Sequence, residues 1–172
     1  RSDAPPVEGA ELEAIRDHMI PRGPDGAGSW ISSNGRIGLA HRRLSIIDLS
    51  TAAAQPMAFG DGRYQITYNG EIYNFRALRA ELEAKGQVFK TNSDTEVLLH
   101  LYHLYGTDMV GHLRGMYAFT IWDEAKRGLF LARDPFGIKP IYYADTGGTL
   151  RAASTVKALR AGGKVGTGVN PA

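Results

Sequence analysis

The order of hydrophobic and polar residues predicts both helices and strands. Apolar residues recur at helical spacing over residues 10–19, which predicts an amphipathic helix that ends before a Pro-rich loop. Two further helical stripes begin after residues that are typical helix N-caps, Asn74 and Ser93. Ser93 and Glu96 also have the spacing of a capping box. We therefore expect three helices.

Short runs of β-type residues surround the last two of these helices. Asn34-Gly35 separates the first two runs, and this dipeptide is a strong hairpin signal. The chain thus has strands, two helices and then strands again, which indicates an α+β fold with mainly antiparallel sheet instead of alternating βαβ units. The predicted strands cover residues 29–33, 37–41, 63–68, 116–122, 129–132, 141–144 and 149–153.

Composition limits the classes of function. At 172 residues with 43% hydrophobic content, the chain has the mass of one domain, which we place at residues 1–160, and residues 161–172 read as a Gly-rich exit or linker. The net charge of +2 is small and its charges are interspersed, so we expect neither a nucleic-acid partner nor an anionic membrane. No apolar run reaches the roughly 20 residues of a membrane span.

The 172 residues contain no cysteine. This excludes disulfides, thiolate metal ligands and a cysteine nucleophile within them. It also fits a cytoplasmic protein. His, Asp and Glu do not occur with the spacing of a metal site, so we expect no metal.

The segment Tyr68–Asn74 carries the most informative chemistry. After a strand, the side-chain amide of Asn69 and the backbone amide of Gly70 can both donate to one oxygen, as an oxyanion hole requires. The alternative is a plain Asn-Gly turn, which turn statistics favour for the dipeptide by itself. Glu71 is either a site carboxylate or an exposed charge at the end of a strand.

Three more residues are candidates for binding a small substrate. Arg43 suits a substrate carboxylate, because a guanidinium binds it with two hydrogen bonds, but a surface ion pair is the alternative. Asp94 suits an ammonium group, although acidic residues also stabilise the first turn of a helix. Together they would hold the two charged ends of an α-amino acid. His41 could act as a base, but an isolated histidine is more often structural.

The run Arg133–Pro140 reads as a rigid turn between strands. Pro135 and Pro140 restrict the backbone, Gly137 allows the bend, and Asp134 is expected to bind local amides. We interpret this motif as structural.

Eight motifs, which are named below in chain order, resemble the glutaminase domain of glutamine-hydrolysing asparagine synthetases. These enzymes are class II glutamine amidotransferases. The resemblance covers about residues 10–160. The motifs are Arg22–Asp25, His41–Asp48, Gln55–Met57, Tyr68–Asn74, Thr91–Glu96, Gly115–Phe119, Arg133–Pro140 and Ser154–Leu159.

The resemblance implies an N-terminal-nucleophile hydrolase fold, a four-layer αββα sandwich of two mainly antiparallel sheets. It implies hydrolysis of glutamine to glutamate and ammonia, which is transferred to an activated carboxylate. Arg43 would bind the α-carboxylate, Asp94 the α-ammonium, and Glu71 the amino end of glutamine. Asn69 and Gly70 would form the oxyanion hole.

The family pattern also includes parts that this chain lacks. The nucleophile would be an N-terminal cysteine activated by its own amine, on a first strand that begins Cys-Gly-Ile. Arg1-Ser2-Asp3 resembles the segment after that strand, so we expect one short strand to be missing and Ser2 to be a poor substitute for the nucleophile. Without the strand we expect an exposed sheet edge. Pro21, Ala152 and Thr155 are further departures, of which we interpret Ala152 and Thr155 as packing or local changes.

The synthetase domain of the family is absent from this chain. ATP and Mg²⁺ would belong to that domain, so we expect no cofactor here. The expected partners are glutamine and a synthetase domain in cis or in trans, and a homodimer is left open. The alternative function is a non-catalytic binding or scaffold domain that kept the fold and lost its nucleophile.

Overall fold

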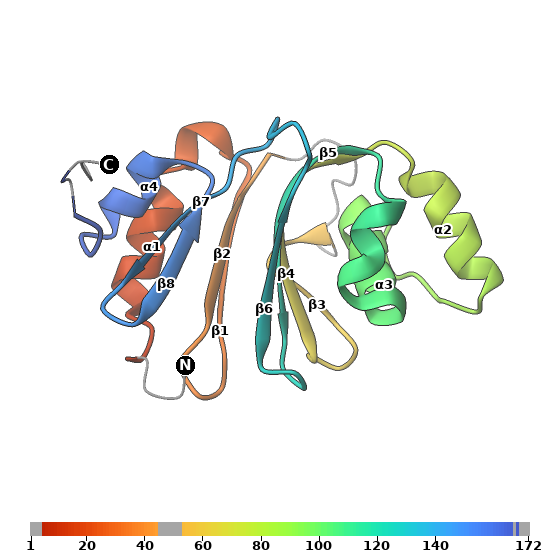
Figure 1. Ribbon diagram of the computed structural model, residues 1–172, viewed down its shortest axis with the longest axis horizontal. Helices are drawn as coiled ribbons and strands as arrows, with labels where there is room; N and C mark the ends of the chain where they lie inside the picture. The colour runs from red at the N-terminus through yellow and green to blue at the C-terminus, as the bar shows by residue number, and fades with distance from the viewer. Residues whose placement is uncertain (1–4, 45–52, 167, 169–172) are drawn as a thin grey trace.

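The computed structural model describes residues 5–44, 53–166 and 168. Figure 1 shows four layers: helices α1 and α4, two hairpins, a four-stranded sheet, and helices α2 and α3. The α+β class, the antiparallel sheets and the αββα order of the layers agree with the fold expected from the sequence. Ser2, the poor substitute for the nucleophile, and residues 45–48 of the motif His41–Asp48 lie outside the described residues.

The described residues include four α-helices, which form the two outer layers. They are α1 (Gly9–Asp17), α2 (Phe75–Ala84), α3 (Asp94–Tyr105) and α4 (Val156–Ala161). The first three confirm the predicted helices, whereas α4 was not predicted. The 3₁₀ helices η1 (Ile20–Arg22) and η3 (Gly106–His112) were not predicted either.

The strands form three antiparallel sheets among the described residues. Sheets β1–β2 and β7–β8 have two strands each, and the larger sheet has the order β3-β4-β5-β6. All seven predicted strands are present, and the short strand β3 was not predicted. The bounds are β1 (Gly26–Ile31), β2 (Gly38–Arg43), β3 (Met57–Phe59), β4 (Tyr64–Ile72), β5 (Gly115–Asp123), β6 (Gly128–Arg133), β7 (Tyr142–Thr146) and β8 (Thr149–Ala153).

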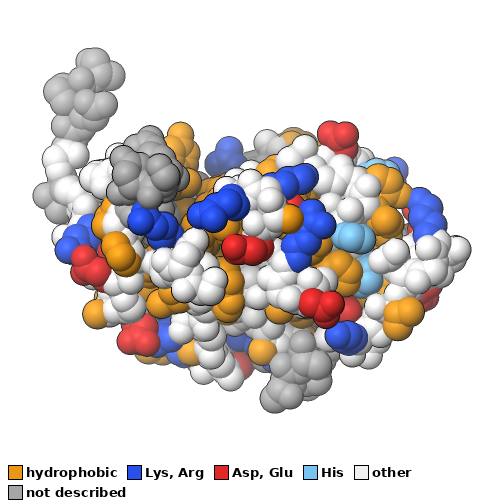
Figure 2. Space-filling view, turned by 90° about the horizontal axis from the view of Figure 1, so that it is seen from below, with side chains coloured by type: hydrophobic (Ala, Val, Ile, Leu, Met, Phe, Trp, Pro, Cys, Tyr) orange, Lys and Arg blue, Asp and Glu red, His pale blue; other side chains and the backbone are white. Residues whose placement is uncertain are grey.

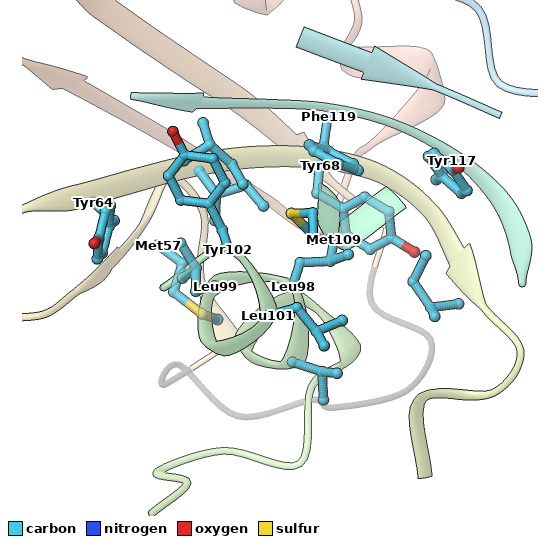
Figure 3. Packing of buried hydrophobic residues seen from close by; sticks show 14 of the residues in the cluster. Met57, Tyr64, Tyr68, Leu98, Leu99, Leu101, Tyr102, Met109, Tyr117 and Phe119 are labelled. Atoms are coloured by element: carbon cyan, nitrogen blue, oxygen red, sulfur yellow. The ribbon is translucent and has the colours of Figure 1, made fainter. Parts of the chain in front are cut away.

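The main hydrophobic core lies between the large sheet and α3. Every residue of α3 from Asp94 to Tyr102 is buried, which is more than the single apolar face expected from its pattern. Figure 3 shows Leu98, Leu101 and Tyr102 of α3 facing the aromatic side chains of the sheet. The helix can be buried all round because α2, η3 and β3 cover the sides that the sheet does not.

The N-terminus of α3 differs from the predicted capping box. The Ser93 hydroxyl accepts a hydrogen bond from the Thr95 amide at 3.0 Å, so Ser93 is the N-cap. The Glu96 carboxylate, however, accepts from the amides of Lys90 and Thr91 at 2.8 and 2.7 Å. The Ser93 amide instead donates to the Thr91 hydroxyl at 3.1 Å. Glu96 therefore organises the loop before the helix.

The turn at Asp134 confirms its predicted structural role. One carboxylate oxygen accepts from the amides of Phe136 and Ile138, and the other accepts from Lys139 and Tyr117. Burial raises the pKa of Asp134, but these backbone donors outweigh burial and lower the pKa overall. A single ionised side chain thus ties the turn to β5.

The end of the chain packs against its beginning. The Thr155 hydroxyl accepts from the Ala158 amide at 3.1 Å and caps α4, which explains this residue as a local feature. A Cβ on Gly162 would lie 3.0 Å from the Glu11 and Ile15 side chains of α1. Lys164 Nζ lies 3.1 Å from a Glu8 carboxylate oxygen. The division at residue 160 remains a prediction.

The surface has mixed charge. Figure 2 shows basic and acidic side chains interspersed over one face of the molecule. In the described part of the chain, no helix is both long and apolar enough to cross a membrane.

Candidate functional site

One large cavity lies between the two hairpins and the four-stranded sheet. Its volume is about 1090 Å³. The five predicted site residues all line it, although they come from three separate parts of the chain: Arg43, Asn69, Gly70, Glu71 and Asp94. The structure therefore brings the residues of β2, β4 and the start of α3 to one space.

Strand β2 directs two adjacent arginines to opposite faces. Arg42 donates to the Gly23 carbonyl at 3.0 Å and lies 3.8 Å from Asp17, so it belongs to the side covered by α1. Successive side chains of a strand alternate between faces. Arg43 and His41 consequently face the inner side, toward the large sheet, and both are half-buried.

Asn69 and Gly70 lie within β4 and do not form a turn. The strand continues to Ile72, and Asn69 and Gly70 pair with Ala118 and Tyr117 of β5. This excludes the Asn-Gly turn that the dipeptide by itself favoured. Because Tyr68 and Ile72 point into the core with α3, the intervening side chains of Asn69 and Glu71 face the hairpin layer. Glu71 is exposed, whereas Asn69 is half-buried.

The backbone of Gly70 points to the open edge of β4. Its partner Tyr117 donates its amide to Asp134 Oδ2 at 3.3 Å and accepts from the Asp134 amide at 2.8 Å. Both backbone groups of Tyr117 therefore face away from β4, so Gly70 and Tyr117 form a pair without hydrogen bonds. The Gly70 amide faces the other edge, and no hydrogen bond among the described residues uses it.

Side chains occupy this edge of β4 on both sides of Gly70. Strand β3 pairs with β4 only from Tyr64 to Ile66. Beyond it, the Tyr68 amide donates to Gln55 Oε1 at 2.6 Å, and the Ile72 amide donates to Asp94 Oδ2 at 3.1 Å. Two side chains thus take the place of a neighbouring strand and leave the amide of Gly70 between them.

Close packing explains why residue 70 is glycine. A Cβ at this position would lie 2.2 Å from the Met116 carbonyl oxygen and 2.8 Å from the Tyr117 Cα. Gly115 of β5, which pairs with Ile72, is equally restricted, because a Cβ there would lie 2.1 Å from the Glu71 carbonyl oxygen. Packing against β5 therefore requires glycine at residue 70, apart from any role of its amide in an oxyanion hole.

Asp94 is a buried carboxylate at the first residue of α3. Its side chain is 5% exposed, and Oδ2 accepts from the Tyr68 hydroxyl at 2.8 Å as well as from the Ile72 amide. Burial raises the pKa of Asp94 more than these donors lower it. A positively charged group in the cavity would relieve the cost of keeping this carboxylate ionised.

His41 is a half-buried ionisable group on the inner side of β2. Burial and the adjacent charge of Arg43 lower its pKa to about 4. The imidazole is therefore neutral at pH 7, and it adds no positive charge to the cavity.

Sequence reasoning overlooked two residues of this region, Gln55 and Tyr68. The Gln55 side chain connects the edge of β4 to α3, because Nε2 donates to the Thr95 hydroxyl at 3.3 Å. Both residues lie inside motifs that carried the resemblance, which was the available signal. Their contacts depend on how β4 packs against α3, and residue spacing does not report this.

Metal ligation has no support within the described residues. No group of three or more His, Asp or Glu side chains there could hold a metal ion.

The comparison with protein families identifies the domain. The family model described as "Glutamine amidotransferase domain" matches residues 3–172. This chain belongs to the glutamine amidotransferase domain family. The match covers nearly the whole sequence and includes all three parts of the chain that contribute the five predicted site residues.

Two curated relatives are glutamine-hydrolysing asparagine synthetases. The chain is 45% identical over 148 residues to "Asparagine synthetase [glutamine-hydrolyzing] 1" of Bacillus subtilis. The matched region covers 86% of this chain and 23% of the relative. It is 42% identical over 160 residues to "Asparagine synthetase B [glutamine-hydrolyzing]" of Escherichia coli, covering 92% of this chain and 28% of the relative. The chain therefore spans about a quarter of the length of these synthetases.

A solved structure supports the fold. The glutamine phosphoribosylpyrophosphate amidotransferase from B. subtilis superposes with a TM-score of 0.76 at 24% identity and covers 93% of this chain and 42% of that chain. This similarity confirms the N-terminal-nucleophile amidotransferase fold expected from the motifs.

Proposed function

We propose that this domain binds glutamine and hydrolyses it to glutamate and ammonia, for transfer to a carboxylate activated by a synthetase domain. The observation that carries the proposal is that Arg43, Asn69, Gly70, Glu71 and Asp94 line one cavity. Membership of the glutamine amidotransferase family supports the substrate. The length of the relatives supports a synthetase partner, because the matched region is about a quarter of each protein.

In this proposal, opposite charges hold the two ends of the amino acid. Arg43 binds the α-carboxylate, and Asp94 binds the α-ammonium with help from Glu71. The inward direction of Arg43 and the burial of Asp94 support these roles. Because Asp94 is buried, the affinity gained from an ammonium group is larger than at an exposed carboxylate.

Asn69 and Gly70 stabilise the oxyanion that forms when the glutamine amide is attacked. The outward-facing amide of Gly70 and the half-buried side chain of Asn69 support this role. One such donor typically contributes about 3–4 kcal/mol to transition-state stabilisation.

The nucleophile must come from outside these 172 residues, since they contain no cysteine. The cavity supports a position for it. All residues of β2 and β8 line the cavity, whereas no residue of β1 does, so the two hairpins present facing strand edges. An extended segment between β2 and β8 would join them into one sheet and would lie in the space that Asn69 and Gly70 share. We propose that residues 1–172 without such a segment have little or no glutaminase activity.

Calorimetry of glutamine binding tests the substrate site without requiring a nucleophile. We expect binding to residues 1–172 that falls by at least about tenfold in Arg43→Ala, since a hydrogen bond to a charged group contributes about 1.5–3 kcal/mol. Arg42→Ala is the matched control. Arg42 also lines the cavity, but its guanidinium is held on the α1 side by the Gly23 carbonyl, so its loss should reduce the affinity much less than the loss of Arg43. Equal losses in both variants, or no binding to the parent protein, would contradict the proposal.

A second candidate is a non-catalytic binding or scaffold domain, favoured by the absence of cysteine from the 172 residues. Such a domain would bind glutamine in the same cavity and release no ammonia even in its natural full-length form. Location in the cytoplasm, formation of a homodimer, and ATP and Mg²⁺ in a separate synthetase domain remain predictions.

A further inference from the structure

Tyr68 links the edge of β4 to the start of α3. Its side chain is 5% exposed, and Figure 3 shows its ring among the core residues between the sheet and the helices. The hydroxyl donates to Asp94 Oδ2 at 2.8 Å. The same oxygen accepts the Ile72 amide at 3.1 Å, so two donors from β4 determine the orientation of the carboxylate.

The direction of this hydrogen bond follows from the charges. Burial and the negative charge of Asp94 both raise the pKa of Tyr68, so the phenol stays protonated. A protonated hydroxyl can donate to an ionised carboxylate, which forms a strong charge-assisted hydrogen bond. The contact consequently favours the charged form of Asp94 against the effect of burial.

The backbone of Tyr68 is held as well. Gln55 Oε1 accepts the Tyr68 amide at 2.6 Å, and Gln55 Nε2 donates to the Thr95 hydroxyl at 3.3 Å. Thr95 and Asp94 are the first two residues of α3. Tyr68 is therefore connected to the start of α3 through both its main chain and its hydroxyl, which limits movement of Asp94 relative to Gly70.

We propose that the Tyr68 hydroxyl is a positioning group of the glutamine site, which holds the Asp94 carboxylate in the orientation that receives the α-ammonium. This inference rests on the proposed function and adds a residue to it. The ring of Tyr68 fills the core, and phenylalanine would fill the same volume. The hydroxyl has a separate role: it orients the Asp94 carboxylate and favours its ionised form in a low-dielectric core.

Other ionisable groups must be considered in a test that uses pH. Glu71 on β4 also acts on Tyr68 by its charge. His41 and Arg43 of β2 line the same cavity. None of them changes in Tyr68→Phe, so a difference between the parent and this variant reports the loss of the hydroxyl.

The experiment combines two readouts on the parent protein, Tyr68→Phe and the control Tyr102→Phe. Tyr102 is another 5%-exposed tyrosine, and it packs on Phe130 at a ring-centroid distance of 5.8 Å. We expect Tyr68→Phe to raise the Asp94 pKa, measured by carboxyl ¹³C NMR, and to weaken glutamine binding by about tenfold at pH 7. The acidic limit of the binding profile should move to higher pH, whereas Tyr102→Phe should change neither quantity.

A double variant tests whether Tyr68 acts through Asp94. In an Asp94→Asn background, Tyr68→Phe should cause no further loss of affinity. An unchanged Asp94 pKa, unchanged binding in Tyr68→Phe, or a variant that fails to fold would overturn the proposal, because the hydroxyl would then be irrelevant or structural. Absence of glutamine binding by the parent protein overturns the proposed function instead. In that case, the change in the Asp94 pKa in Tyr68→Phe still shows whether the Tyr68 hydroxyl favours the ionised carboxylate.

Discussion

At the scale of single residues, the candidate site combines side chains that line the cavity with neighbouring residues that hold them in place. Arg43 and Asp94 were identified because a fixed cation and an acid suit the two ends of an amino acid. Gln55 and Tyr68 were overlooked, because a glutamine beside a proline and an aromatic residue in a strand have ordinary structural explanations. Their hydrogen bonds to β4 and Asp94 depend on tertiary packing.

Asp94→Asn should separate stability from function. The pKa of Asp94 in the folded protein is raised above its ordinary value of 3.8. The favourable contribution of Asp94 to folding is therefore complete at a pH below 3.8, and it is lost as the pH rises through the folded-state pKa. Asparagine removes the buried charge and can still accept from Tyr68 and Ile72. We expect equal or higher stability in urea at pH 7, with glutamine affinity reduced by at least about tenfold, since losing one partner of a buried charge pair costs about 2–5 kcal/mol.

The stability of Asp94→Asn should also depend less on pH than that of the parent between pH 4 and 8. A clear loss of stability at pH 7 would show that Asp94 is a structural residue, and unchanged glutamine binding would remove it from the site.

At the scale of elements, periodicity predicted helices and strands well where one local pattern dominates. The Asn34-Gly35 hairpin and the helices after Asn74 and Ser93 are examples. The capping box was wrong in its second half, because Glu96 is closer to the loop amides of Lys90 and Thr91 than to Ser93. Strand β3 and helix α4 are three and six residues long, which is too short for a periodic signal.

Gly70→Ala should disturb the pairing of β4 with β5. The added methyl would lie 2.2 Å from the Met116 carbonyl oxygen, and backbone atoms cannot move aside as a side chain can. We expect a loss of about 1–3 kcal/mol in the free energy of unfolding, measured in urea, together with weaker glutamine binding. Gly111→Ala is the control, because no atom lies within 4 Å of a Cβ there. Equal stability of the two variants would contradict the packing account.

At the scale of the whole molecule, the αββα order was predicted from the resemblance, whereas the strand order alone gave only α+β. The arrangement of the hairpin layer could not be predicted, because it depends on contacts between distant segments. The ion pair of Glu11 with Arg151, for example, joins α1 to β8 across most of the sequence. This layer presents the facing edges of β2 and β8 to the cavity.

A strand supplied between β2 and β8 should stabilise the domain. We expect an N-terminal extension that begins Cys-Gly-Ile and has β-type residues to raise the melting temperature of residues 1–172. For a chain of 172 residues, each 1 kcal/mol of stabilisation corresponds to about 2–4 °C. An extension of equal length with proline at alternate positions is the control, because proline cannot donate to a ladder. Identical melting temperatures for the two extended proteins would contradict the proposed place of the strand.

The most direct test of the central claim is glutamine hydrolysis by the natural full-length protein, with its N-terminal residue identified by intact mass. The account predicts a mature N-terminal cysteine and, in the absence of ATP and an acceptor carboxylate, release of glutamate and ammonia in equal amounts. At glutamine concentrations below saturation, this release should fall by at least about tenfold in Arg43→Ala. A protein that binds glutamine through Arg43 but has no N-terminal cysteine and releases no ammonia would contradict it, and the domain would then be a binding module.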